Sequence, residues 1–380
     1  MFCFDVKEIE STSRSNDGYF QQTSFWTEFK EAHGWKCRKF NVSWTYSEKN
    51  AESDAEVSVM LRSFCHGFFT FAYVPLFPEL PFAKTDAHDQ NIEFSNFLSE
   101  LGKVLKAFLP SNTLCIRFDP AVGFDSPEGR DEFVQGMKVI SFADRLSLKK
   151  SRVDIQPPDS TRINLLKTEE EILAGMKTKW RYNVNLSVRK GVEIECVKAG
   201  SDKFNEKLDI FYELYKVTAE RDGIAIHSKS YYEDLLKKSS EEIAAGKDVP
   251  CVSLYLARHE QDYLGAIITL FSKTESIYLY GCSSNVKRNL MPNFLLQWTA
   301  MKDAKSYGSA YYDMYGMPPT DDENHPMHGL YLFKTGFGGQ NIHRIGSFDV
   351  PVSAFYSLYR TAERLRAFWH KKILKKIRGR

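Results

Sequence analysis

The chain has 380 residues, of which 43% are hydrophobic and 14% aromatic, and its formal net charge is +2. This length exceeds what one hydrophobic core usually spans, so two domains are expected, and the apolar content excludes a disordered chain. The small net charge gives no overall field for a polyanion, which leaves local charge as the only electrostatic signal. Seven isolated cysteines without a CxxC pair exclude a zinc-finger spacing and are typical of buried thiols in a reducing compartment.

The N-terminus has no basic segment followed by a long apolar one, and no run of about 18 uncharged apolar residues occurs anywhere. We therefore expect neither a signal peptide nor a membrane span, and a cytoplasmic location. The nine histidines show no ligand spacing, and His325 with His328 comes closest. No metal site is expected.

The first half of the chain alternates strand-like and helix-like runs. Residues 35–44, 56–64 and 68–77 are rich in β-branched and aromatic residues, which predicts three strands. Residues 91–109 place apolar side chains at helical spacing. The run 113–120 then predicts a buried strand that ends at a proline.

A connector follows at 151–160, where two prolines favour an extended segment. "TRINLL" predicts a strand, and Thr168 with Glu171 forms the pattern of a capping box at a helix start. Two helices are expected over 203–223 and 230–246, and three strands over 250–260, 263–272 and 275–284. A long helix over 293–308 and a strand over 309–316 follow.

Strands, then a long helix, then another strand is the layout of the acyltransferase fold called GNAT, and the first half repeats it more loosely. We predict an α/β (α+β) protein of two GNAT-like domains, although no sequence repeat accompanies the repeated order. The first domain would comprise 1–158 plus 345–380, because the run "HRIGSFDV" and the helix after it fit its sheet. The second would comprise 159–344.

The turn before the long helix, "SSNVKRNLMPNF" (283–294), has no glycine. A CoA-dependent enzyme needs glycines there, because backbone N–H groups must approach the pyrophosphate at the helix N-terminus. Pro292 also lacks an N–H group. The turn argues against acetyl-CoA as acyl donor and leaves other donors open, including an aminoacyl ester on tRNA.

Residues from about 19 to 360 resemble the FemABX (Fem-type) peptidoglycan aminoacyltransferases. The resemblance is carried by "KWRYNVNLSVRKGVEI", "YELYKVTAERDGIAIHSKSYYEDL", "IYLYGCSSNVKRNLMPNFLLQWTAMKDAKSYGSAYYDMYG" and "GLYLFKTGFGG". It implies two GNAT-like domains without a CoA loop, in the compact form that lacks a helical arm. It also implies transfer of an amino acid from aminoacyl-tRNA, without a cofactor, to the stem-peptide amine of UDP-MurNAc-pentapeptide or lipid II.

The resemblance assigns three residues to catalysis. Lys334 matches a lysine associated with the aminoacyl end of tRNA, and Phe333 is its aromatic neighbour. Asp119 matches an acidic residue near the acceptor and is the best visible base. A fixed cation can stabilise the tetrahedral oxyanion, bases can stack on Phe333 or Phe337, and the glycines of "TGFGG" would let backbone approach the nucleotide.

Substrate-binding positions follow from the same resemblance. Lys30 matches a lysine on the diphosphate of the precursor, and Tyr231 and Tyr280 match tyrosines of the nucleotide-sugar cleft. The family arginine that joins the lysine falls at about His227 here, with Lys229 close enough to substitute. This departure leaves open how the diphosphate is held, and it would also fit a lipid-linked acceptor.

Two segments are strongly basic, 176–191 and the tail 361–380, which has eight Lys or Arg and one Glu. The tail also carries aromatic and aliphatic residues, mostly on one helical face. We prefer peripheral contact with an anionic membrane for the tail. Binding to the tRNA backbone is an alternative for both segments, and a solvated helix packed on the first domain is another for the tail.

Two other functions compete with aminoacyl transfer. One is a GNAT-type N-acyltransferase with a different acyl donor. The other is a catalytically inactive scaffold that binds tRNA or membrane. The transferred amino acid, the form of the acceptor and its acceptor residue are not readable from the sequence.

Overall fold

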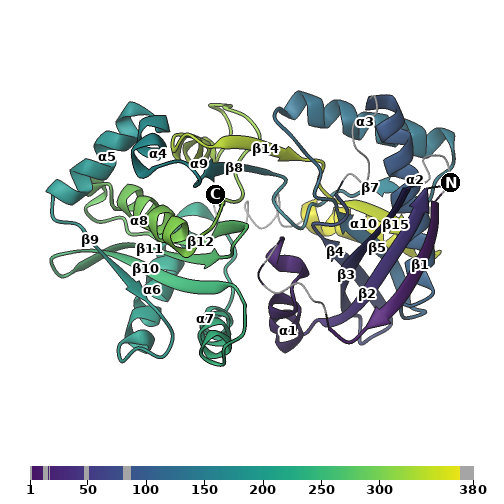
Figure 1. Cartoon of the computed structure of the whole chain (residues 1–380), viewed down its shortest axis with the longest axis horizontal. Helices are drawn as coiled ribbons and strands as arrows, with labels where there is room; N and C mark the ends of the chain where they lie inside the picture. Colours follow the sequence, from purple (N-terminus) through teal and green to yellow (C-terminus); the bar gives the residue numbers. More distant parts are fainter. Residues whose placement is uncertain (1, 12–15, 17, 47–50, 80–86, 369–380) are drawn as a thin grey trace. The chain divides into compact units, whose positions relative to one another are not determined.

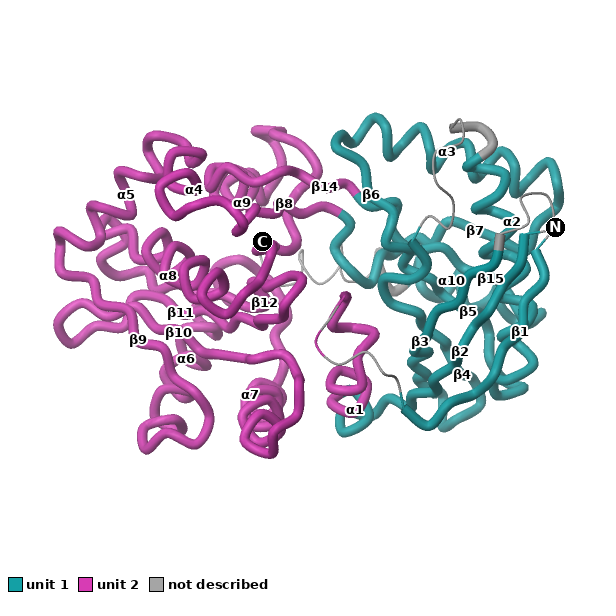
Figure 2. The backbone as a smooth tube through the Cα atoms, in the orientation of Figure 1, with its two compact units in different colours: residues 1–12, 30–158, 344–380 teal, residues 13–29, 159–343 magenta. Residues whose placement is uncertain are grey.

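The computed structural model describes the chain except for residues 1, 12–15, 17, 47–50, 80–86 and 369–380. It forms two compact units, shown in Figure 2. Unit 1 comprises 1–12, 30–158 and 344–380, and unit 2 comprises 13–29 and 159–343. Residues 13–29, which we expected in the first domain, belong to unit 2. There the Asn16 amide donates to the Tyr307 hydroxyl at 2.8 Å.

Unit 1 is built on one seven-stranded sheet with the order β1-β2-β3-β4-β5-β15-β7 (Figure 1). Neighbouring strands are antiparallel except β4 and β5, which are parallel and joined through helix α2. The elements assigned to this unit are β1 (Phe2–Ile9), β2 (Lys36–Tyr46), β3 (Ala51–Phe64), β4 (Phe69–Pro75), α2 (Ala87–Lys106), β5 (Thr113–Asp119), β6 (Gly123–Phe124), α3 (Pro127–Ala143), β7 (Lys149–Lys150), β15 (Phe348–Pro351) and α10 (Tyr356–Phe368).

The sheet of unit 2 runs β14-β8-β13-β12-β11-β10-β9, with helices on both faces (Figure 1). Only β12 and β13 pair in parallel, and α8 connects them. The elements are η1 (Phe20–Gln22), β8 (Asp159–Asn164), α4 (Glu169–Gly175), α5 (Thr178–Arg189), β9 (Glu193–Val197), α6 (Phe204–Asp222), α7 (Lys229–Ala244), β10 (Cys251–His259), β11 (Asp262–Phe271), β12 (Glu275–Ser283), η2 (Arg288–Leu290), α8 (Pro292–Tyr307), β13 (Tyr311–Asp313), α9 (His328–Thr335) and β14 (Gln340–Arg344). Helix α1 (Ser24–Ala32) begins in unit 2 and ends in unit 1.

The two units repeat one order of elements. In each, three antiparallel strands are followed by a helix and then by a strand that returns parallel to the third one. The helices α2 and α8 make these crossovers, and each packs its apolar side on its own sheet. The prediction of two GNAT-like domains in an α/β (α+β) fold is confirmed.

Local sequence patterns predicted most helices and strands correctly, and the wrong predictions have physical causes. The capping box is present, since the Glu171 amide donates to Thr168 Oγ1 at 3.2 Å and the Thr168 amide donates to Glu171 Oε2 at 2.8 Å. The single strand expected in "HRIGSFDV" is instead the end of β14 and the start of β15. Gly346, with φ of +67°, turns the backbone between them.

Three expectations about side chains and segments meet different outcomes. Cys115, Cys251 and Cys282 are buried, but Cys3, Cys65 and Cys196 are exposed, so the prediction of buried thiols holds for only some of them. Among the residues that the structure describes, no helix combines the length and the apolar composition needed to cross a membrane. Most of the basic tail, from 369 on, lies outside the described residues.

Candidate functional site

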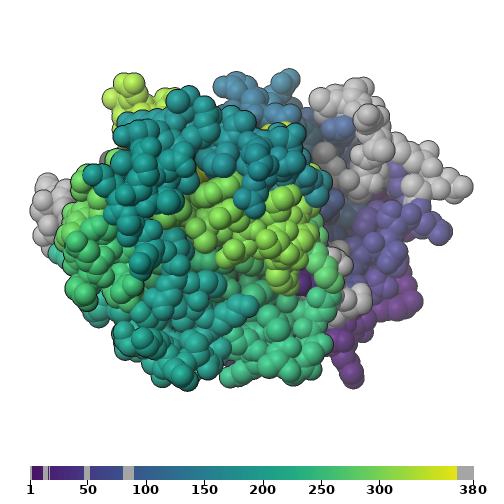
Figure 3. All heavy atoms as spheres, turned by 60° about the vertical axis from the view of Figure 1, so that its left-hand side comes forward, coloured from purple at the N-terminus to yellow at the C-terminus, as the bar shows by residue number. Residues whose placement is uncertain are grey.

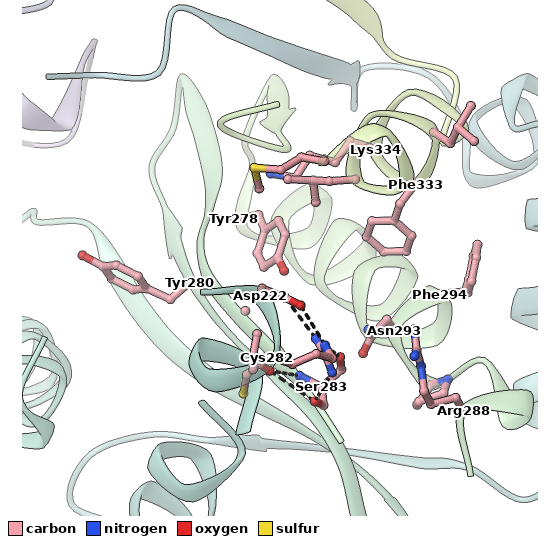
Figure 4. A pocket seen from close by; sticks show the side chains of 18 of the residues that line it. Asp222, Tyr278, Tyr280, Cys282, Ser283, Arg288, Asn293, Phe294, Phe333 and Lys334 are labelled. Atoms are coloured by element: carbon pink, nitrogen blue, oxygen red, sulfur yellow. Dashed lines mark hydrogen bonds and ion pairs between the residues drawn. The ribbon is translucent and has the colours of Figure 1, made fainter. Parts of the chain in front are cut away.

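A cavity opens in unit 2 where β12 and β13 part. The two strands pair over only three positions, and the last pair joins Ile277 to Asp313. Strand β12 is also irregular, because Ile268 lies opposite Tyr280 and the next residue of β11 lies opposite Tyr278, so Leu279 is bulged out. The space beyond has a volume of about 930 Å³ and is lined from β12, α5, α6, α8 and α9 (Figure 4). That size suits a ligand pocket.

Lys334 lies in the last turn of α9 and lines this cavity, although its side chain is only 5% exposed. Its Nζ donates to the carbonyl oxygens of Met314 at 2.6 Å, Gly316 at 2.8 Å and Tyr315 at 3.3 Å. These carbonyls follow β13, where the ladder with β12 has ended. The lysine therefore satisfies backbone acceptors that the separated strands leave without sheet partners.

Burial changes the proton affinity of this lysine. Loss of hydration lowers the pKa of Lys334 to about 7, and the negative charge of Asp313 opposes that shift only in part. The Nζ atom also lies 5.1 Å from the centre of the Tyr278 ring. Near neutral pH the side chain is thus divided between ammonium and amine, which is the range in which a group can both accept and donate a proton.

Contrary to our expectation, the segment "GLYLFKTGFGG" does not hold its glycines open to a nucleotide. It forms α9 and the turn to β14, and the glycines of its "TGFGG" end, Gly336, Gly338 and Gly339, pack against protein. A Cβ on Gly336 would lie 2.2 Å from a ring carbon of Trp180, and one on Gly338 would lie 2.2 Å from the Gly175 carbonyl oxygen. The idea that these glycines admit a nucleotide is therefore wrong. Their small size lets α9 approach α4 and α5 closely.

The two phenylalanines of this segment have different surroundings. Phe337 is 1% exposed and belongs to the core of unit 2, so the expectation that a base could stack on it is wrong. Phe333 lines the cavity, and its ring meets that of Phe294 edge-on with centres 5.3 Å apart (Figure 4). The indole N–H of Trp180 holds the backbone by donating to the Phe333 carbonyl at 2.8 Å.

Three residues predicted to bind the acceptor come together in unit 2. The His227 ring stacks on Tyr231 with centres 4.0 Å apart and an interplanar angle of 15°. Its centre lies 6.4 Å from that of Tyr280, which also lines the cavity of Lys334. Phe29, from α1, packs on Tyr231 at 4.8 Å. Burial raises the pKa of both tyrosines, so both carry neutral hydroxyls.

The remaining predicted cations lie elsewhere. Lys229 is partly exposed and forms an ion pair with Asp209 at 2.5 Å, so it does not join the His227 cluster. Lys30 belongs to unit 1, where its Nζ lies 5.5 Å from the centre of the Trp35 ring. The Arg62 guanidinium lies 5.4 Å from the same ring. Burial and the nearby charge of Arg62 lower the pKa of Lys30 to about 8.

Asp119 is buried at the end of β5 in unit 1. Its carboxylate accepts from the Tyr73 hydroxyl at 2.6 Å and the Gln156 amide at 3.0 Å, and the Ser347 hydroxyl also donates to it. Burial raises its pKa, although these three donors work against the shift. Asp119 thus ties two distant segments of unit 1 together. Its role as a base rests on the resemblance alone and stays a prediction.

Two cations of the cavity, Lys179 on α5 and Arg288 on η2, were not among the predicted site residues. Lys179 lies in the basic run 176–191, for which tRNA binding was one of the alternatives. A third, Arg221, is held by Asp222, by Asn285 and by the carbonyl and hydroxyl of Ser283. In Figure 4 the Arg288 side chain lies near Asn293, at the start of α8.

The turn before α8 has the irregular backbone that its sequence suggests. Lys287 and Met291 have φ of 49° and 55°, and Pro292 occupies the first turn of the helix. No row of glycine N–H groups faces the cavity here. Figure 3 shows the yellow-green segment around α9 at the surface beside teal and green segments of the same unit.

The sequence matches one protein family over most of its length. The model of the FemAB family matches residues 9–245 and 239–364. The chain belongs to the FemAB family. The expected membership is thereby confirmed on almost the whole length of the sequence.

Its relatives include named enzymes. The lipid II:glycine glycyltransferase of Staphylococcus aureus strain MRSA252 is 24% identical over 421 residues, which cover 95% of this chain and 94% of that one. The enzyme of the same name from strain USA300 is 24% identical over 429 residues. The crystal structure of FemX covers 93% of this chain and 100% of its own, with 22% identity and a TM-score of 0.66, and so shares the fold. The expectation of an aminoacyltransferase is confirmed at the level of the family.

Proposed function

We propose that this FemAB-family protein transfers an amino acid from aminoacyl-tRNA to the stem-peptide amine of a peptidoglycan precursor. The observation that carries the proposal is the position of Lys334, buried at the wall of a 930 Å³ cavity in unit 2. The named relatives, which are lipid II:glycine glycyltransferases, support the reaction class. Because aminoacyl-tRNA is made in the cytoplasm, the proposal places the reaction there.

The donor would enter this cavity with its 3′ end. Lys179 and Arg288 offer positive charge to phosphates of a single strand, and Phe333 offers a ring against which a base can stack. The turn before α8 supports an RNA-borne ester over coenzyme A, because it contains a proline and two left-handed residues in place of a glycine cradle.

In the reaction, the acceptor amine attacks the ester carbonyl, so that a C–N bond forms and the bond to the ribose 3′-oxygen breaks. The amine loses a proton and the ribose oxygen gains one. Lys334, with a pKa of about 7, can protonate that leaving oxygen. The Lys334 ammonium donates to three carbonyls, and its hydrogen bond to Tyr315, at 3.3 Å, is the longest. We expect the substrate to replace the Tyr315 carbonyl as acceptor before the other two.

The acceptor would lie along β12. Tyr280 belongs both to the cavity and to the cluster with His227 and Tyr231, so an amine held by that cluster would meet the ester at the same strand. We propose that His227 takes over, by stacking and hydrogen bonding, part of the work of the arginine that the family pattern has at this place. Lys30, with a lowered pKa, remains the proposed contact to the diphosphate.

One incubation tests the proposal. The protein is mixed with tRNA charged with individual labelled amino acids and with either UDP-MurNAc-pentapeptide or lipid II, and the muropeptide product is weighed by mass spectrometry. We expect a mass increase of one or more aminoacyl residues. Lys334→Ala should abolish the increase. If acyl-CoA is consumed and no charged tRNA is, the proposal fails.

Lys305→Ala is a matched control for the lysine variant. The Lys305 ammonium also donates to two carbonyls, those of Leu165 and Lys167, each at 2.8 Å, but it does not line the cavity. Lys305→Ala should therefore lower stability without removing transfer. Equal activity losses in the two variants would show that Lys334 acts only through folding.

A further inference from the structure

Unit 1 contains a second cavity of about 630 Å³ whose charge is entirely positive. Four cations line it, Arg145, Lys149, Arg152 and Arg360, together with hydroxyls from four Ser or Thr residues and Tyr356. No Asp or Glu is among the described residues around it. Segments 145–152 and 351–361, far apart in the sequence, build it together.

The cations are not neutralised by the fold. Within the described part of the chain, Arg145, Lys149 and Arg152 form no ion pair, and the Nε atom of Arg360 is buried without a hydrogen-bond partner. Asp349 and Glu363, carboxylates of the same region, are already paired with the buried Arg117 at 2.6 and 3.0 Å. Four like charges held around one hollow raise the free energy of the empty site, so an anion bound there would be stabilised.

Large exposed apolar side chains lie close in the sequence to residues that line this hollow. Phe142, one turn before Arg145, is 84% exposed, and Val139 on the same helix is 57% exposed. Phe355 and Leu358, beside the lining residues Tyr356 and Ser357, are 58% and 64% exposed. Protein surfaces that insert into a lipid headgroup layer typically combine exposed apolar side chains with basic ones.

We propose that this hollow, named here the basic pocket (145–152 with 351–361), binds the phosphate of an anionic phospholipid headgroup and docks unit 1 on a membrane. The alternative occupant is an RNA phosphate. The aliphatic Val139 and Leu358 favour lipid, because they gain from entering the acyl boundary but give a base no ring to stack on. The last twelve residues add six Lys or Arg and no acidic residue, so the composition of the sequence that follows α10 also favours an anionic lipid surface.

The test uses the full chain and flotation with vesicles of phosphatidylglycerol or of phosphatidylcholine. We expect binding to the phosphatidylglycerol vesicles only. The variant Arg145→Gln/Lys149→Gln/Arg152→Gln should bind them roughly 100-fold more weakly, since each cation near an anionic surface contributes about fivefold. The control Lys36→Gln/Lys106→Gln/Lys198→Gln loses the same charge from exposed lysines outside the pocket and should bind nearly as the wild type does.

A second variant keeps every charge. Phe142→Ser/Leu358→Ser should weaken vesicle binding about tenfold or more while leaving tRNA affinity in a gel shift unchanged. The proposal is overturned if the triple-glutamine pocket variant binds vesicles as its control does, or if the serine variant binds them as the wild type does. A loss of tRNA affinity with vesicle binding intact would also overturn it and assign the pocket to RNA. Thermal melting excludes misfolding of either variant.

Discussion

Replacing Lys334 with methionine removes a charge but keeps the length of the side chain, so it isolates the effect of the buried ammonium. In the folded protein this group has a pKa of about 7, against its ordinary value of 10.5. Between these two pH values the unfolded chain carries the proton and the folded one does not. The free energy of unfolding therefore rises with pH across this window. Below about pH 7 both states carry the proton, so the penalty for burying the ammonium is at its full size and no longer changes with pH.

The size of the effect follows from the difference between the folded and unfolded pKa values of Lys334. At about 1.4 kcal/mol per unit, full desolvation of the ammonium costs the folded state on the order of 5 kcal/mol at low pH. Methionine avoids this cost but leaves the Met314 and Gly316 carbonyls without their donor, which costs roughly 1–3 kcal/mol each. The two changes nearly cancel at pH 7. At higher pH the wild type should gain on the variant by at most about 1.4 kcal/mol per pH unit.

The assay is urea unfolding of wild type and Lys334→Met at half-unit steps from pH 6 to 9.5. Their difference in unfolding free energy should be flat below about pH 7 and then grow in favour of the wild type. In the transfer assay, kcat should fall 10²- to 10³-fold, the usual loss for a group that stabilises charge in the transition state. A pH-independent difference would mean that the ammonium is not desolvated, and the proton-transfer role assigned to it would then be refuted.

Two further changes address the walls of the same cavity. Arg288→Gln should weaken binding of aminoacyl-tRNA and reduce the slope of log affinity against log salt by about 0.7, because one phosphate contact on a single strand is lost. The slope is measured by gel shift from about 50 to 200 mM salt. An unchanged slope would exclude that contact. Gly336→Ala should lower stability by roughly 1–3 kcal/mol, because its Cβ would overlap the Trp180 ring at 2.2 Å, whereas Gly329→Ala, with open space around it, should cost less than 1 kcal/mol. Equal midpoints for these two variants in thermal melting would contradict the packing role of Gly336.

Most of the secondary structure could be predicted from the sequence, because strand and helix periodicity and helix caps are local. The capping box at Thr168 and the order of strands around α8 are examples. Helix α9 could not, since its eight residues include Gly329 and are followed by Gly336, and its apolar and aromatic residues are also typical of a loop that binds RNA. What makes it a helix is its packing against Trp180 and the three carbonyls that Lys334 reaches.

The sequence alone determines the family membership and identifies Lys334, Phe333 and Tyr280 as candidates, because motif order is a property of the linear chain. Their chemistry was not. The pKa of Lys334 depends on the separation of β12 from β13, and the stacking of His227 on Tyr231 depends on how α7 begins. The basic pocket joins Arg145 to Arg360 across more than 200 residues. Only tertiary packing brings such groups together, because burial and distance, which set charge and proton affinity, are not encoded in sequence spacing.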